Sequence, residues 1–478
     1  MLPRLAAILF LLVALGRPAI GQESAAPGGQ AASSGQSQSS SAQPQSPHAG
    51  DLWSRDALTG NWGGWRSKLE DMGIVFGADT IDEALGNPTG GTNEGAIYEG
   101  RLELFTTIDL GKTVGWSGAT FHTNAYWIRG RGLSANDLDN NLFTASNIEA
   151  ARSLRLFDLW VEQSLLNTAL TIRAGQIAAD DEFFISPTAA TFINSTFGWP
   201  AIMASDLPSG GPAYPLATPG VRVKYAATDT ISMLAGLFNG DPAGAGSGDP
   251  QLRDASGTAF RIGGSALAIL EGDYAVNQDP QSKGLAASYK LGVWFHSGDF
   301  ADQEFDNTGL LLASPASSGI PEEHQHDGGA YLVLDQALLN ETDPATRNIS
   351  VFLRLSGAPA DRNPVSLYAD AGINLTGYVA HRANDVLGLA VGVARISAGA
   401  RDFDEDVRDF TGLETPVRDQ EVVLELTYRA QVTPWWSLQP DFQYVWHPGG
   451  NVALSGPTLS TEPVPDAAVI GLRSAVVF

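Results

Sequence analysis

From residue 74 to the C-terminus, the chain is a series of short segments in which apolar and polar residues alternate. In residues 421–429, for example, Val422 and Leu424 fall on one face, whereas Glu421 and Glu425 fall on the other. A period of two residues is typical of a β-strand with one apolar face. The pattern predicts strands at residues 74–83, 97–110, 117–129, 154–165, 170–178, 219–227, 230–238, 266–277, 284–297, 329–337, 348–356, 367–378, 386–398, 420–431, 435–446 and 467–478.

The connections between these segments alternate between short and long. Brief links fall at residues 111–115, 166–167, 227–229 and 433–434, whereas long stretches rich in Gly, Pro and Asp fall at 130–153, 179–218, 239–265, 298–328 and 447–466. Strands that cross a membrane must pair all their backbone groups, so they run up and down in a closed barrel. Such barrels carry tight turns at the periplasmic rim and long loops outside. The sequence therefore predicts an all-β fold over residues 74–478, a transmembrane antiparallel barrel with 16 strands.

Two-residue alternation would also suit a soluble β-sandwich, so it is weak evidence by itself. Hydrophobic residues make up 43% of the chain, yet no apolar run after residue 21 approaches the roughly 18 residues of a membrane helix.

Residues 1–21 contain Arg4, then an apolar run, then small residues at their C-terminal end, a pattern that predicts a removable secretory signal peptide. Residues 22–50 form a Gln/Ser/Pro-rich tract that predicts a disordered lead-in.

Composition excludes several classes of function. The chain has no Cys, which removes thiolate metal sites and cysteine nucleophiles. Its formal charge of −25 argues against a nucleic-acid partner and is compatible with divalent-cation bridging to outer-membrane lipid and lipopolysaccharide.

A C-terminal Phe478 at the end of an alternating strand is typical of barrels recognised by the barrel-assembly machinery. Aromatic residues near predicted strand ends are expected to form interfacial girdles. They are Trp116, Tyr126, Trp127, Trp435, Trp436, Tyr444 and Trp446.

Several motifs, in order along the chain, resemble the carbohydrate-selective outer-membrane porins of the porin B family. They are NWGGWRSKLEDMGI at 61–74, LFDLWVEQ at 156–163, IRAGQ at 172–176, DEFF at 181–184, FINSTFGWP at 192–200, LFNGDP at 237–242, QPDFQY at 439–444 and HPGG at 447–450. The resemblance implies a short periplasmic N-terminal helix within residues 51–73. It also implies a 16-stranded barrel in the bacterial outer membrane, with a narrowed lumen that prefers sugars. The stretch before residue 51 and the loop at 298–328 are not explained by the resemblance.

A barrel of this size leaves an aqueous passage unless a segment narrows it. The long segment 179–218 contains Phe183, Phe184, Phe192, Phe197 and Trp199, which would form a large apolar patch on a surface loop. We therefore expect this segment to fold inward as a constriction loop. Sugar selection needs partners for hydroxyl groups and an apolar platform for the ring.

Alternate residues of a strand face the lumen, and this alternation, called parity below, predicts together with the recognised motifs which residues contact the solute in the constriction. Charges of both signs around one ring favour a neutral solute over an ion. The alternative is that each is an ordinary polar wall residue that braces the loop. The candidates are Arg101, Glu103, Glu162, Arg173, Asn194, Trp199, Arg222, Lys224, Arg354 and Glu425.

The function that we expect is passive diffusion of glucose-like monosaccharides into the periplasm. The alternatives are an enzyme, such as a glycosidase with the carboxylates of residues 180–182, and a general or anion-selective porin. Residues 402–406 imitate half of a calcium loop, but Val407 stands where Gly is required, and His324 and His326 form only a weak zinc signal. No metal or cofactor is expected. The particular sugar and a homotrimeric state stay open.

Overall fold

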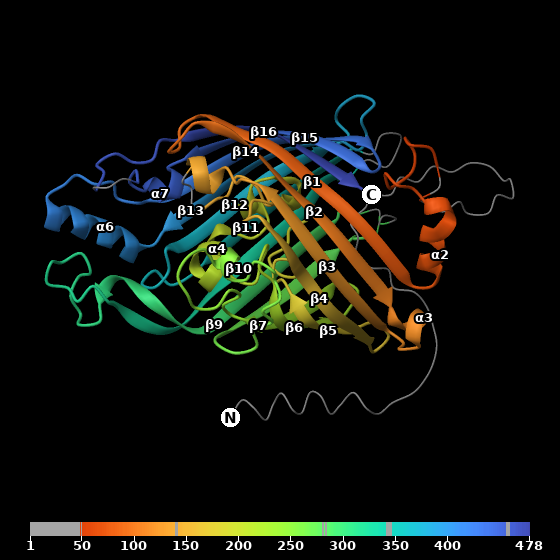
Figure 1. Ribbon diagram of the computed structural model, residues 1–478, viewed down its shortest axis with the longest axis horizontal. Coiled ribbons are helices and arrows are strands. Elements are labelled where there is room, and N and C mark those ends of the chain that lie inside the picture. The colour runs from red at the N-terminus through yellow and green to blue at the C-terminus, as the bar shows by residue number, and fades with distance from the viewer. Residues whose placement is uncertain are drawn as a thin grey trace. The chain divides into compact units, whose positions relative to one another are not determined.

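The β-strands of the computed structural model form one closed antiparallel barrel (Figure 1). The structure describes residues 48, 50–138, 142–279, 282, 284–340, 347–455 and 459–478. Successive strands are hydrogen-bonded, and β1 pairs with β16 to close the sheet. The strands are β1 (Ile74–Thr89), β2 (Gly95–Asp109), β3 (Ala119–Gly130), β4 (Ser153–Leu165), β5 (Leu170–Ile177), β6 (Thr218–Ala226), β7 (Ile231–Asn239), β8 (Ala266–Val276), β9 (Ala287–Asp306), β10 (Pro321–Asn340), β11 (Asn348–Gly357), β12 (Val365–Thr376), β13 (Val386–Ile396), β14 (Gln420–Thr433), β15 (Trp436–Trp446) and β16 (Ala467–Val477).

The predicted fold class and strand order are confirmed, but three strands, β1, β9 and β10, are much longer than expected. The β9–β10 hairpin continues to the pair Pro321↔Asp306, so most of the predicted loop at 298–328 is strand. The sequence did not indicate this extension because strands that pair beyond the membrane need no apolar face. The predicted signal peptide and nearly all of the predicted lead-in lie outside the described residues.

Apart from α6, which has 14 residues, the helices in the described part of the chain have 7 residues or fewer, and all of them lie before β1 or in the connections between strands. None of them is both long and apolar enough to span a membrane. They are η2 (Trp62–Gly64), α2 (Trp65–Asp71), α3 (Leu110–Val114), η3 (Ser134–Leu138), η4 (Ala189–Thr191), η5 (Ser195–Phe197), α4 (Ala201–Asp206), η6 (Pro208–Gly210), α5 (Pro250–Arg253), α6 (Ala398–Thr411) and α7 (Pro448–Asn451).

Residues 402–406, which imitate half of a calcium loop in sequence, lie within helix α6. The Ser397 side chain accepts a hydrogen bond from the Ala400 N–H and caps the helix at its start. Gly412 ends the helix with a φ of 68°, in the left-handed region that glycine adopts without strain. Asp404 forms an ion pair with Arg418, with 2.7 Å between Nε and Oδ2. The segment is therefore a capped helix, which agrees with the argument from Val407 against a calcium loop.

The two faces of the barrel wall differ as the alternation predicts. On β13, Ala390 and Ala394 face the interior and are buried, whereas Leu389 and Val391, on either side of Ala390, are 44% and 38% exposed. Inward-facing Arg473 on β16 forms an ion pair with Glu83 of β1. Apolar side chains are therefore turned toward the membrane, and charged side chains are retained inside the barrel.

Val391→Arg tests this assignment, because it places a charge near the middle of the outward face of β13. We expect a loss of about 2–4 kcal/mol in the free energy of unfolding, the usual cost of arginine on a lipid-facing wall near the bilayer midplane. Urea unfolding in phospholipid vesicles measures it. Val391→Ile is the matched control and should change stability little. Equal stability of the two variants would mean that this face is not in contact with lipid.

Candidate functional site

The connection between β5 and β6 lies inside the barrel. These residues, 178–217, are called the inward loop from here on, and they contain η4, η5, α4 and η6. The side chains of Phe183, Phe184, Phe192 and Phe197 are each 1% exposed. They pack with inward-facing apolar side chains of β7 to β15 in one hydrophobic cluster. The expectation that this segment folds inward is confirmed, and the cluster shows why its sequence is so aromatic.

Strands β14 and β15 hold the middle of the inward loop. The Glu425 carboxylate accepts hydrogen bonds from the backbone N–H groups of Ile193 and Asn194, at 2.6 and 2.9 Å. The Asn194 side chain in turn donates to Gln443 Oε1 at 3.0 Å. Both Glu425 and Asn194 are 0% exposed. A carboxylate that binds two successive N–H groups holds this turn of the loop in one position.

Arg354 on β11 is a second anchor. It donates to the carbonyl oxygens of Thr196 and Gly198, at 2.7 and 2.8 Å, and forms a buried ion pair with Asp370 of β12. Arg354 is 0% exposed, as are Asn194 and Glu425. The prediction that these three residues contact the solute is therefore corrected: the loop seals this side of the barrel, and they hold it there.

The opposite edge of the loop meets β4, β5 and β6 in a cluster of four charged residues, Glu162, Arg173, Glu182 and Arg222, called the charge cluster below. Arg173 lies 3.1 Å from Glu162 and 2.6 Å from Glu182. Arg222 lies 2.6 and 2.9 Å from the same two carboxylates. Glu162 and Arg173 are 21% and 15% exposed, whereas Arg222 is only 5% exposed. The cluster therefore joins the loop to the wall and also presents charge to the open part of the lumen.

Arg101 on β2 is held less tightly. Its ion pairs to Asp79 and Glu103 measure 3.7 and 3.6 Å, which is longer than an ordinary hydrogen bond. Its guanidinium carbon lies 4.6 Å from the ring centre of Tyr126 and 5.7 Å from that of Tyr214. The side chain is 18% exposed. Arg101 therefore has more hydrogen-bonding capacity left for a solute than Arg222 has.

Three aromatic rings form a row along the lumen wall on neighbouring strands. His122 on β3 stacks on Trp160 of β4, with 4.9 Å between ring centroids, and on Phe105 of β2 at 6.3 Å. The Arg173 guanidinium carbon lies 3.7 Å from the Trp160 ring centre. All three rings are partly exposed. This aromatic row therefore places a flat apolar surface beside the charge cluster.

The remaining predicted residues lie at the edges of the site. Lys224 is exposed on β6, two residues from Arg222 toward the short turn after that strand. Trp199 is partly buried, and its indole N–H donates to the Gly210 carbonyl at 3.0 Å. This bond lies within the inward loop, which supports the alternative that Trp199 stabilises the loop.

The candidates predicted from the sequence did not include the three rings of the aromatic row, nor Tyr126, Asp79 and Glu182. Tyr126 is 6% exposed and lies under Arg101 inside the barrel, so its assignment to the interfacial girdle is wrong. Asp79 has inward parity on β1 and could have been found by extending the parity rule to that strand. Glu182 lies in the loop, where parity gives no information, so only the fold brings it to Arg222.

The described residues contain no group of three or more His, Asp or Glu arranged to hold a metal ion. His324 lies 2.7 Å from Asp302, in an ordinary polar pair. The site therefore consists of guanidinium groups, carboxylates and aromatic rings. Its chemistry suits binding of a polar solute.

A closed barrel with apolar outward residues and a loop folded into a charged interior is the architecture of an outer-membrane channel. The model of the carbohydrate-selective porin, OprB family matches residues 93–478. Porin B of Pseudomonas aeruginosa is 23% identical over 453 residues, which cover 90% of this chain and 94% of that protein. The putative porin QuiX of Acinetobacter baylyi is 22% identical over 465 residues, which cover 90% and 95%.

The fold comparison agrees with the family model. The high-pH structure of OprB from Pseudomonas putida has a TM-score of 0.76 and 24% identity, and the match covers 88% of this chain and 98% of that one. The chain belongs to the carbohydrate-selective porin, OprB family. It is a porin of the bacterial outer membrane, and because its relatives are porins, the enzyme alternative is rejected.

The Arg354–Asp370 pair gives a test of loop anchoring. Arg354→Met should lower the free energy of unfolding by about 3–5 kcal/mol, because it leaves a buried carboxylate without its partner. The released loop should also raise single-channel conductance. The double variant Arg354→Met/Asp370→Leu removes both charges and should recover part of the stability. Urea unfolding and planar-bilayer recording measure the two effects, and an Arg354→Met barrel with wild-type stability and conductance would contradict the anchoring role.

Proposed function

We propose that this porin lets neutral, glucose-like monosaccharides diffuse passively into the periplasm. The proposed path runs between the inward loop and the wall of β2 to β6. The observation that carries the proposal is the aromatic row beside the charge cluster and Arg101. The loop fills the other side of the barrel with buried apolar side chains, so a polar solute has its partners on this side.

Charges of both signs lie beside this path, which favours a neutral solute. They include the guanidinium groups of Arg101, Arg173 and Arg222, and the carboxylates of Asp79, Glu103, Asp158, Glu162, Asp181 and Glu182. An ion of either sign meets attraction and repulsion together. A sugar hydroxyl both donates and accepts hydrogen bonds, so it can use both kinds of group. Diffusion down a concentration gradient needs no coupled energy source.

Individual residues contribute differently to the proposed path. Arg101 offers hydrogen-bond donors to hydroxyl groups, and Trp160 offers the apolar face on which the C–H side of a sugar ring stacks. Arg173 joins Trp160 to the charge cluster, because it lies over the Trp160 ring and binds Glu162. Arg222 is buried between carboxylates, so its main effect is to hold Glu162 and Glu182 in position.

Trp160→Ala tests the stacking role. Reconstituted in a planar bilayer, the wild-type channel should show low ion conductance that glucose reduces. Loss of a stacking contact of about 1 kcal/mol should raise the half-blocking glucose concentration roughly fivefold in Trp160→Ala. Trp127→Ala is the matched control, because Trp127 lies on the neighbouring strand and is 50% exposed on the outward face. An unchanged half-blocking concentration in Trp160→Ala would remove Trp160 from the proposed path.

Arg101→Ala tests the charge balance. Removal of one guanidinium increases the excess of carboxylates beside the path, so the reversal potential in a salt gradient should move further toward cation selectivity. Block by glucose should weaken at the same time, because a donor is lost. Arg173→Ala should act in the same direction. If both variants keep wild-type selectivity and block, the solute does not pass beside these residues.

A swelling assay with proteoliposomes compares the proposal with a general or anion-selective porin. We expect glucose and related hexoses to enter faster than disaccharides, and faster than charged solutes of equal size. A general porin would instead sort solutes by size alone and conduct ions well without block by sugar. An anion-selective porin would admit sugar acids before neutral sugars.

A further inference from the structure

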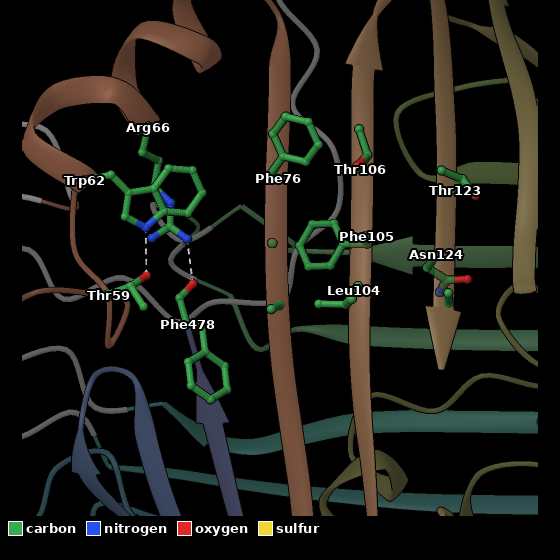
Figure 2. Close-up of a pocket in the computed structure, with 13 residues that line it drawn as sticks. Thr59, Trp62, Arg66, Phe76, Leu104, Phe105, Thr106, Thr123, Asn124 and Phe478 are labelled. Carbon is green, nitrogen blue, oxygen red and sulfur yellow. Dashed lines mark hydrogen bonds between the residues drawn. The ribbon is translucent and has the colours of Figure 1, made fainter. Parts of the chain in front are cut away.

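A groove on the outer wall of the barrel, at its short-turn end, is not used by the proposed function. Its volume is about 490 Å³, within the roughly 300–1,000 Å³ of small-molecule sites. Side chains of three neighbouring strands form its floor, and residues before β1 and at the C-terminus form its side (Figure 2). The lining residues used below are Phe76, Ala78, Leu104, Ala125, Trp62 and Phe478.

The floor of the groove belongs to the face that contacts the membrane. Ala78 pairs with Leu104, and Leu104 pairs with Ala125, so these side chains lie in one row across β1, β2 and β3. These side chains lie on the outward face of the sheet, opposite to the inward-facing Asp79 and Arg101. Phe76 and Leu104 are 46% and 53% exposed. The small side chains of Ala78 and Ala125 leave the hollow between these bulkier neighbours.

Trp62 forms the side of the groove and is held there by an unusual backbone. Its φ is 51°, a left-handed value that is strained for a residue other than glycine. The indole N–H donates to the Thr59 hydroxyl at 3.0 Å, and the Arg66 guanidinium carbon lies 4.4 Å from the ring centre. Trp62 is nevertheless 40% exposed. These contacts fix the ring in place but leave part of it uncovered.

Arg66 connects this side of the groove to the end of the barrel. Its Nη2 donates to the main-chain oxygen of Phe478 at 2.6 Å, and its side chain is only 5% exposed (Figure 2). The Leu58 N–H donates to the Val477 carbonyl at 2.8 Å. The segment before β1 is therefore attached where β1 and β16 close the sheet. The groove is formed at this junction by the attached segment and the barrel wall.

We propose that the groove binds one acyl chain of a phospholipid. The occupant must come from the membrane, because the floor is on the outward face of a transmembrane barrel. Short turns of such barrels face the periplasm, and the periplasmic leaflet of the outer membrane consists of phospholipid. Trp62 lies where indole rings favour the level of lipid headgroups, and the exposed Lys68 of α2 offers a cation to the phosphate. The bound chain holds the N-terminal segment against the wall.

Native mass spectrometry of the full chain, purified from outer membranes in mild detergent, tests the proposal. Wild-type protein should retain one phospholipid per barrel. Ala78→Phe and Ala125→Phe fill the hollow and should retain at least fivefold less. The matched control is Ala84→Phe, because Ala84 is exposed on the same face of β1 and does not line the groove. Equal retention in Ala78→Phe and Ala84→Phe would overturn the proposal, as would retained lipopolysaccharide or a change of oligomeric state in Ala78→Phe.

A second measurement needs no substitution in the barrel wall. Phosphatidylethanolamine with brominated acyl chains is titrated into the detergent-solubilised protein, and tryptophan fluorescence is recorded. A saturable quenched component should appear and should be absent from Trp62→Phe. Quenching that rises linearly without saturation, or that is identical in Trp62→Phe, would mean that lipid contacts this wall without a defined site. Block of the channel by glucose is not expected to change in any of these variants.

Discussion

The requirement that every backbone N–H and C=O group within the membrane find a partner is the constraint on which this structure depends. The chain meets it by pairing β1 with β16, so that the sheet has no free edge. Closure produces two surfaces that must differ chemically, an outer one that contacts lipid and an inner one that can hold charge. The alternation of residues along each strand, the buried ion pairs and the inward loop all follow from that division.

The inner surface is itself divided by the inward loop. On the side of β7 to β15, the loop and the wall form a packed hydrophobic cluster with buried anchors such as Arg354 and Glu425. On the side of β2 to β6, charges of both signs and three stacked rings remain partly open. Similar residue types therefore act differently on the two sides. A buried arginine between carbonyl groups stabilises the loop, whereas an arginine with long ion pairs can still bind a solute.

The N-terminal segment and the C-terminus complete the barrel from outside. Arg66 binds the main-chain oxygen of Phe478 across 412 positions of the sequence, and it also supports the ring of Trp62. This contact makes the closing seam the place where the segment before β1 is fixed. The outer groove arises at the same place, because small residues on β1 and β3 lie next to this support. The proposed sugar path and the proposed lipid groove thus lie on opposite faces of β2 and β3.

The sequence by itself determined the strands, their order and the faces of most side chains, because alternation and turn signals act over a few residues. Arg101, Glu162 and Arg173 could be assigned to the lumen by parity alone. Only the tertiary structure decided which lumen residues stay open to water, because that depends on where the loop packs. In the structure, Asn194, Arg354 and Glu425 are buried and anchor the inward loop, although the sequence had placed them in contact with the solute. Glu182 of the loop contacts Arg222, and Tyr126 lies inside the barrel beneath Arg101. The position of a residue along its strand determines which face of the sheet its side chain lies on, whereas packing between distant segments determines which residues that side chain contacts.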